Sequence, residues 1–223
     1  MTDAVPHFSN AAATATYAEN ALRLVPGLVA LHRMTLLLLA ENAPAAARVL
    51  VLGAGGGMEL RVFAEAQPGW RFDGVDPAPA MLALAEQTLG PLMHRVTLHE
   101  GYIDTAPAGP FDAATCLLVL HFLTRGDRLA TLRQLRQRLK PGAPLVVAHH
   151  SFPQEAGRKD LWPGRFAAYA DAPGKADPAR AQMFAQLPVL SPDADETLLR
   201  EAGFTDVTLF YAAFTFRGWV AYR

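Results

Sequence analysis

The sequence predicts an α/β fold in which a doubly wound, mostly parallel sheet carries helices on both faces. Between residues 48 and 150, short apolar runs alternate with segments of helical length, which is the order that builds βαβ units. The apolar runs are continuous, for example VLVL at 49–52 and LVVA at 145–148, as strands buried on both faces require. A glycine-rich turn, GAGGG at 53–57, directly follows the first of these strands.

Local signals delimit each element of this alternation. The pairs Pro26-Gly27, Pro68-Gly69 and Pro141-Gly142, and the single Pro44, each follow a helical segment, and proline and glycine interrupt helices. In chain order we expect helix 10–24, helix 28–42, strand 48–53, helix 57–66, strand 71–76, helix 79–89, strand 95–101, a segment 111–123 that begins as a strand, helix 126–139 and strand 143–150.

The segment 151–190 breaks the alternation with five prolines and three glycines. It is too long for a plain connection, so we expect a lid or a wall of the substrate site. Its aromatic residues include Phe152, Trp162, Phe166, Tyr169 and Phe184. After it, Ser191 and a following proline begin a helix that Gly203 ends, and the aromatic runs 206–214 and 214–223 read as two closing strands.

Composition predicts one globular domain spanning residues 1–223, with 1–45 as a helical cap. Hydrophobic residues make up 51% of the chain and its formal net charge is −1, so neither nucleic acid nor a membrane surface is an expected partner. The single cysteine, Cys116, leaves no internal disulfide and no multi-cysteine metal site. The first 25 residues lack the pattern of a secretory signal, and we expect a cytoplasmic protein with no bound metal.

The glycine-rich turn is the first candidate binding feature. It joins a strand to a helix N-terminus, where free N–H groups and the helix dipole favour a ligand and glycine lets that ligand approach the backbone. A tight turn without a ligand is the alternative. The dinucleotide pattern would place its third glycine at position 58, which is Met58.

Asp76 is the second feature, because it stands at the end of the next strand, 23 residues after Gly53. An acid at this place can accept hydrogen bonds from both hydroxyls of a ribose. It could equally cap the following helix. The turn and the acid together favour a ligand that contains a nucleoside.

Six motifs follow one another in the order VLVLGAGGG, GVDPAPAML, HEGYID, FDAATCLLVLHFL, LKPGAPLVVAHH and LLREAGF. From about residue 17 to its end, the sequence resembles the class I S-adenosylmethionine-dependent methyltransferases. The resemblance implies a Rossmann-like sheet of seven strands, the last of them antiparallel. It also implies S-adenosylmethionine as cofactor, bound across the carboxyl ends of the first two strands.

The resemblance assigns cofactor contacts position by position. Gly53, Ala54 and Gly55 would pass under the methionyl part and the ribose, in a loop that Gly57 completes, and Asp76 would hold the ribose hydroxyls. The adenine pocket and the methionyl amino group would be contacted by Pro77, Met81, Tyr102, Ile103, Leu118 and Val119.

Two positions depart from the patterns of similar proteins. Such proteins usually carry an acid two residues before the first glycine, where this chain has Val51, so one anchor of the methionyl end is missing. The segments LRLVPGLVALHRM and FTFRGWVAYR also resemble carboxy-S-adenosylmethionine synthase, an enzyme of tRNA wobble modification. That enzyme pairs an arginine with the extra carboxylate, and the position we align with it is Leu198, with Arg200 nearby.

Methyl transfer requires positioning first and a base only when the acceptor carries a proton. His150 and His121 follow strands at the carboxyl edge of the sheet, where such folds place their sites, and imidazole titrates near neutral pH. They are our candidate bases, with a hydrogen-bonded core histidine as the alternative for each. Tyr17 could reach over the site or serve only in packing.

The function that these features predict is methyl transfer to a small, partly apolar acceptor. The alternatives are a carboxy-S-adenosylmethionine synthase, a nicotinamide-dependent oxidoreductase and a non-catalytic protein that binds S-adenosylmethionine. Glu59, in the first turn after the glycines, argues against a phosphate-bearing dinucleotide. The basic helix 126–139 reads as a solvated surface rather than as an RNA-binding face, and a homodimer remains open.

Overall fold

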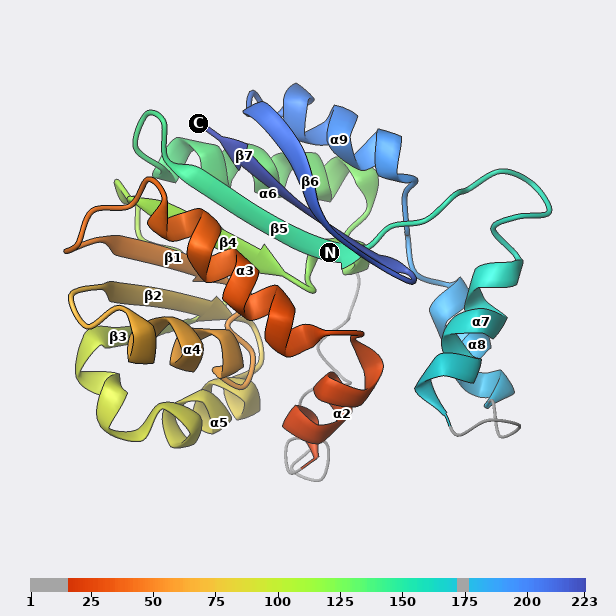
Figure 1. The fold of residues 1–223 in the computed structure, drawn as a ribbon, viewed down its shortest axis with the longest axis horizontal. Helices are drawn as coiled ribbons and strands as arrows, with labels where there is room; N and C mark the ends of the chain where they lie inside the picture. The colour runs from red at the N-terminus through yellow and green to blue at the C-terminus, as the bar shows by residue number, and fades with distance from the viewer. Residues whose placement is uncertain (1–15, 172–176) are drawn as a thin grey trace.

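The computed structural model describes residues 16–171 and 177–223. Its sheet has seven strands in the order β3-β2-β1-β4-β5-β7-β6, as Figure 1 shows. Neighbouring strands are parallel except that β7 runs antiparallel to both β5 and β6, which confirms the predicted fold class. The strands are β1 (Arg48–Leu52), β2 (Arg71–Asp76), β3 (Val96–Glu100), β4 (Ala113–Leu117), β5 (Pro144–His150), β6 (Thr205–Ala213) and β7 (Phe216–Tyr222).

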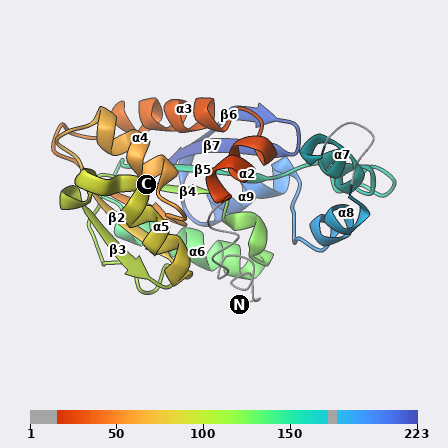
Figure 2. The ribbon, with the colours of Figure 1, turned by 90° about the horizontal axis from the view of Figure 1, so that it is seen from below.

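Helices cover both faces of this sheet (Figure 2). They are α2 (Tyr17–Leu24), α3 (Leu28–Ala40), α4 (Met58–Ala66), α5 (Pro79–Leu89), α6 (Arg125–Arg138), α7 (Leu161–Ala170), α8 (Pro178–Ala185) and α9 (Pro192–Glu201), with short 3-10 turns η2 (Gly90–Arg95) and η3 (Leu120–Phe122). Side chains from α3 and α4 share one hydrophobic core cluster with Val49 and Val51. On the other face α6 and α9 share a second cluster with Leu50 and Leu52. Both faces of β1 are therefore buried, which explains its uninterrupted apolar run.

The two N-terminal helices, α2 and α3, agree with the prediction where the structure describes them. The helix expected over 10–24 is present from Tyr17, and residues 10–15 of that prediction lie outside the described part. Gly27 adopts φ = 70° before α3, so the Pro26-Gly27 pair separates the two helices as expected. In the described residues no single helix is long and apolar enough to span a membrane, and α2 and α3, which pass that test only together, meet at an 86° bend.

β4 ends earlier than its apolar run because of one residue. Leu118 has φ = 62°, a left-handed conformation that interrupts strand pairing and is costly for a residue with a Cβ. Its N–H donates to the carbonyl of Ala148 at 2.6 Å. The chain then forms η3, so the second half of the segment 111–123 turns across the carboxyl edge of the sheet instead of extending it.

The insertion 151–190 forms a helical pair at one end of the molecule (Figures 1 and 2). α7 and α8 stack through Phe166 and Phe184, whose ring centroids lie 4.4 Å apart. The pair is tied to α2 by Arg23, which donates to the carbonyl of Ala170 and lies 3.7 Å from Asp171. The insertion therefore supports the helix that carries Tyr17.

Candidate active site

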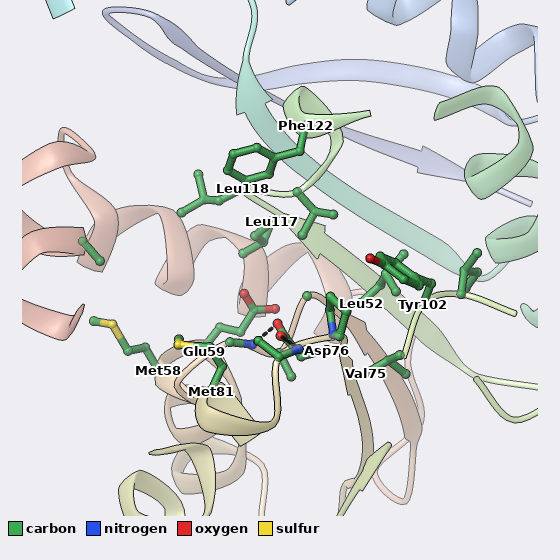
Figure 3. A pocket seen from close by; sticks show the side chains of 18 of the residues that line it. Leu52, Met58, Glu59, Val75, Asp76, Met81, Tyr102, Leu117, Leu118 and Phe122 are labelled. Atoms are coloured by element: carbon green, nitrogen blue, oxygen red, sulfur yellow. Dashed lines mark hydrogen bonds between the residues drawn. The ribbon is translucent and has the colours of Figure 1, made fainter. Parts of the chain in front are cut away.

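A cavity opens at the carboxyl ends of β1, β2 and β4, with side chains from the N-terminal helices on its wall (Figure 3). Every cofactor-binding residue predicted from the sequence lines it, with the exception of Gly57. These lining residues are Gly53, Ala54, Gly55, Asp76, Pro77, Met81, Tyr102, Ile103, Leu118 and Val119. The fold thus brings together residues that four separate motifs supply.

The glycine loop needs its glycines for two different reasons. Gly53 has φ = 82°, and a Cβ built on it would lie 2.1 Å from Cγ2 of Val119, so a side chain here would strain the backbone and displace Val119. Gly57 has φ = 79° and precedes α4, and its added Cβ would lie 3.0 Å from Cα of Ala85. Gly57 is therefore explained by close packing of α4 on α5 rather than by contact with the cavity.

Asp76 presents its carboxylate to this loop. Its Oδ2 accepts a hydrogen bond from the N–H of Gly55 at 2.9 Å, and its Oδ1 accepts one from the N–H of Ala78 at 3.0 Å. Burial raises the pKa of the carboxyl, while these two hydrogen bonds act in the opposite direction. Each oxygen keeps a lone pair for a further donor, so Asp76 can fix the loop and still bind a pair of ligand hydroxyls.

Much of the remaining cavity wall is apolar. Met81 and Asp76 lie across the cavity from Leu117, Leu118 and Phe122 in Figure 3. Pockets with apolar walls and a few converging polar groups are typical of small-molecule sites. The strained Leu118 belongs to this wall, and strained backbone is concentrated at functional sites.

Tyr17 closes the cavity above the glycine loop. A Cβ on Gly55 would lie 2.9 Å from its hydroxyl oxygen, so the phenol ring depends on the absence of a side chain there. Burial, and then the charges of Glu59 and Asp76, raise the pKa of Tyr17 to about 12. The neutral phenol therefore faces both acids at physiological pH.

Among the residues that sequence reasoning did not assign to the cavity wall, two are titratable, Glu59 and His32. Glu59 is buried, and its Oε1 accepts a hydrogen bond from Thr115 Oγ1 at 2.7 Å. Burial lowers the pKa of His32 from 6.5 to about 4, which leaves its imidazole neutral. His32 could have been found as a polar residue on the apolar stripe of α3, between Leu28 and Thr35, whereas Glu59 resembled an ordinary first-turn acid.

The predicted bases His121 and His150 are not among the lining residues of this cavity. His150 Nδ1 lies 3.0 Å from Thr215 Oγ1, and its backbone N–H donates to His121 Nδ1 at 3.4 Å. Burial, and then neighbouring histidines, hold the pKa of both rings well below the ordinary value. The geometry instead favours the alternative, a pair of core histidines.

Aromatic residues of the insertion surround this histidine pair instead of the cavity. The ring of His150 lies 5.0 Å from that of Phe166 and 4.6 Å from that of Phe184. No described residue of 151–190 is a lining residue of the cavity. The expected substrate wall is not seen there, because these aromatic side chains pack on one another and on His150.

The cavity is acidic. Glu59 and Asp76 line it, and no lysine or arginine does so within residues 16–171 and 177–223. Such a site suits a cationic ligand and disfavours a dinucleotide, whose pyrophosphate would face two acids. A glycine cradle, a carboxylate with unused acceptor positions, apolar side chains and a second acid with no described lysine or arginine beside it together fit the sulfonium nucleoside S-adenosylmethionine.

Comparisons with known proteins agree with this fit. Residues 50–145 match the model of a methyltransferase domain. The chain is 31% identical to the carboxy-S-adenosyl-L-methionine synthase of Chromohalobacter salexigens, over 99% of this chain and 85% of the relative.

Two solved structures share the fold at low sequence identity. An O-methyltransferase family protein from Burkholderia thailandensis superposes with a TM-score of 0.69 at 16% identity, over 94% of this chain and 59% of that one. Human N-acetylserotonin methyltransferase in complex with S-adenosylmethionine gives a TM-score of 0.60 at 19% identity, over 94% of this chain and 58% of that one. This chain spans less than two thirds of either structure. With the sheet order, the glycine loop and the full-length relative, these findings establish that the chain belongs to the class I S-adenosylmethionine-dependent methyltransferase family, whose cofactor is S-adenosylmethionine.

Proposed function

We propose that this protein transfers the methyl group of S-adenosylmethionine to a small, partly apolar acceptor. The observation that carries the proposal is the cavity in which Asp76 and the glycine loop meet, with two acids and no described cation on its wall. Asp76 would hold the ribose hydroxyls, Pro77 and Met81 the adenine, and the Gly53–Gly55 backbone the methionyl part. When bound, S-adenosylmethionine supplies a methyl group already activated by its positively charged sulfur.

The protein's own contribution is positioning and exclusion of water. Leu117, Leu118 and Phe122 give the acceptor an apolar surface, and Tyr17 covers the glycine loop from α2. Holding the two reactants in line supplies much of the rate of such displacements. Methyl transfer by positioning alone requires no charged catalytic group when the acceptor has no proton to lose.

His32 is the side chain that we propose to orient the acceptor, by accepting a hydrogen bond, when the acceptor is a hydroxyl. It lines the cavity, and its imidazole is neutral because burial lowers its pKa to about 4. His121 and His150, the histidines proposed from the sequence, have no contact with the cavity and would have to act through a rearrangement. His32→Ala should therefore lower kcat more than the same change at His121.

Carboxylation of the cofactor is the second candidate, since the relative in Chromohalobacter salexigens is a carboxy-S-adenosyl-L-methionine synthase. The cavity of this chain argues against it. Leu198, at the position aligned with the carboxylate-binding arginine, is fully buried in the core. Arg200 instead pairs with Glu196 on its own helix at 3.1 Å, and it is not a lining residue.

One mass-spectrometric experiment separates these functions. The purified protein is incubated with S-adenosylmethionine and a panel of small phenols, amines and carboxylic acids, the last serving also as carboxyl donors, and the masses of all products are measured. We expect S-adenosylhomocysteine together with an acceptor heavier by one methyl group. A heavier, carboxylated S-adenosylmethionine would establish the synthase instead, and binding without any product would favour a non-catalytic protein.

Asp76→Asn provides the matched test of the cofactor site. The amide cannot accept hydrogen bonds at both of its ends, so we expect S-adenosylmethionine binding to weaken about 10- to 100-fold. Asp104→Asn, at an exposed acid on the next loop, should leave calorimetric affinity unchanged. Equal affinities for wild type and Asp76→Asn would refute the ribose assignment.

A further inference from the structure

The missing acid at position 51 has a neighbour that the sheet register identifies. Val51 of β1 pairs with Thr115 of β4, and paired residues on parallel strands project to the same face. Thr115 donates its hydroxyl hydrogen to Oε1 of Glu59 at 2.7 Å. A carboxylate from α4 is thereby held beside the position that carries an acid in similar proteins.

Glu59 also points toward the place where a ligand would lie. It belongs to the cavity wall together with Asp76, and Figure 3 shows both side chains directed into the cavity. Both acids raise the pKa of the Tyr17 hydroxyl, so the two carboxyl groups lie near the same part of the cavity. The structure describes no lysine or arginine on this wall that could neutralise them.

We propose that the carboxylate of Glu59 binds the amino group of the methionyl part of the cofactor and so replaces the acid absent at Val51. The assignment rests on the proposed function. Thr115 is a positioning residue, since its hydrogen bond fixes one oxygen of the carboxylate and leaves the other for the ligand. Ionising a buried carboxyl without a cation beside it is costly, and the ligand's ammonium group would offset that cost on binding.

This arrangement couples binding to a proton. Burial raises the pKa of Glu59 from 4.5 to about 8, against a smaller lowering by Thr115, so the free protein carries a protonated Glu59 at neutral pH. An ammonium group favours the ionised form, and binding below pH 8 therefore releases that proton. The titratable groups around Glu59 are Tyr17, Asp76 and His32 on the cavity wall and Cys116 of β4. Near neutral pH the raised pKa values keep Tyr17 and Cys116 protonated, and the lowered pKa of His32 keeps its imidazole neutral.

The test is calorimetric titration with three compounds of graded structure. All three contain adenosine. S-adenosylmethionine also has the amino-acid group and the positively charged sulfur, S-adenosylhomocysteine has the amino-acid group but a neutral sulfur, and 5′-methylthioadenosine has neither the amino-acid group nor the charge. We expect Glu59→Gln to weaken binding of the first two about 10- to 100-fold and of the third less than about threefold. Glu65→Gln, at an exposed acid on the same helix, should weaken none of them.

Proton release gives a readout that needs no variant. Near pH 6.5, titration of S-adenosylhomocysteine in two buffers of different ionisation enthalpy should show about one proton released per ligand bound by wild type. Glu59→Gln should show a smaller release, because the amide has no proton to lose. No proton released by wild type would overturn the proposal even if Glu59→Gln fails to fold.

The remaining outcomes separate the two proposals. If wild type binds neither S-adenosylmethionine nor S-adenosylhomocysteine, the proposed function fails and the assignment fails with it. If wild type binds both and Glu59→Gln weakens all three compounds alike, or none, only the assignment fails. If Glu59→Gln weakens S-adenosylmethionine alone, the carboxylate faces the sulfonium and the amino-group assignment is wrong.

Discussion

Two left-handed glycines of this chain differ in the space around them, so backbone strain and steric clash can be measured separately. Gly53 is the clearest case, because its left-handed backbone and the contact with Val119 both exclude a side chain. Gly142 is also left-handed, at φ = 75°, but has open space around it. The two glycines therefore form a matched pair in which only Gly53 adds a steric clash to the backbone strain.

Alanine at these positions should separate the two effects. Gly142→Ala should cost about 1–2 kcal/mol of unfolding free energy from backbone strain alone. Gly53→Ala should cost roughly 1–3 kcal/mol more, because the new Cβ overlaps Val119. Urea denaturation measures both variants, and equal losses would show that Val119 moves aside and that the loop tolerates a side chain.

The buried acid Glu59 predicts a dependence of stability on pH. Its pKa is raised from 4.5 to about 8 on folding, so between these values the folded chain holds a proton that the unfolded chain has lost. Stability from this group is present at low pH and falls as pH rises through the window. Wild type should lose up to about 1.4 kcal/mol per pH unit relative to Glu59→Gln.

Urea denaturation near pH 5.5 and about pH 7.5 measures this difference, within the range where the two pKa values lie. Glu65→Gln, at an exposed acid on the same helix, serves as the control and should follow wild type. Parallel stability curves for wild type and Glu59→Gln would contradict the raised pKa.

At the scale of elements, a buried ionic cluster joins three of them. Arg128 of α6 donates to Asp195 of α9, and His149 Nε2 of β5 lies 3.2 Å from Asp195 Oδ2. Burial opposes the charge of Asp195, but His149 and Arg128 prevail and hold the pKa of the carboxyl below its ordinary value. The cluster thus fixes two helices on the face of the sheet opposite α3 and α4.

Asp195→Asn leaves the guanidinium of Arg128 buried without a counter-charge. We expect a loss of about 3–5 kcal/mol in unfolding free energy, because an uncompensated buried charge is strongly destabilising. Asp193→Asn, at an exposed acid in the same first turn, should cost less than about 1 kcal/mol. Similar losses in the two variants would show that the cluster contributes little.

The sequence predicted most elements closely, and the exceptions have physical causes. β2 and α5 begin and end at the predicted residues, 71–76 and 79–89, because Asp76 and proline mark the turn between them. The segment 111–123 was harder, since its continuous apolar run conceals the left-handed Leu118 that ends β4. The aromatic insertion was predicted as a separate segment. That its rings pack against His150 and not against the cavity depends on tertiary contacts, which the local sequence does not reveal.

At the scale of the molecule, the topology determines what could be predicted of the site. Motif order placed the glycine loop, Asp76 and the proposed adenine contacts at one cavity, because these residues follow strands at fixed positions. Glu59 and His32 could not be placed in this way, since they lie on helices α4 and α3 and not at strand ends. Their position at the cavity depends on how these helices pack on the face of the sheet. His121 and His150 follow strands at the correct edge, but η3 and the insertion enclose them in the core.

The most direct test of the account is a crystal structure of the protein with S-adenosylhomocysteine. We predict the ribose hydroxyls on the carboxylate of Asp76, the adenine between Met81 and Ile103, and the amino group on Glu59. Density for the nucleoside elsewhere, or an empty cavity in crystals grown with saturating ligand, would contradict the account.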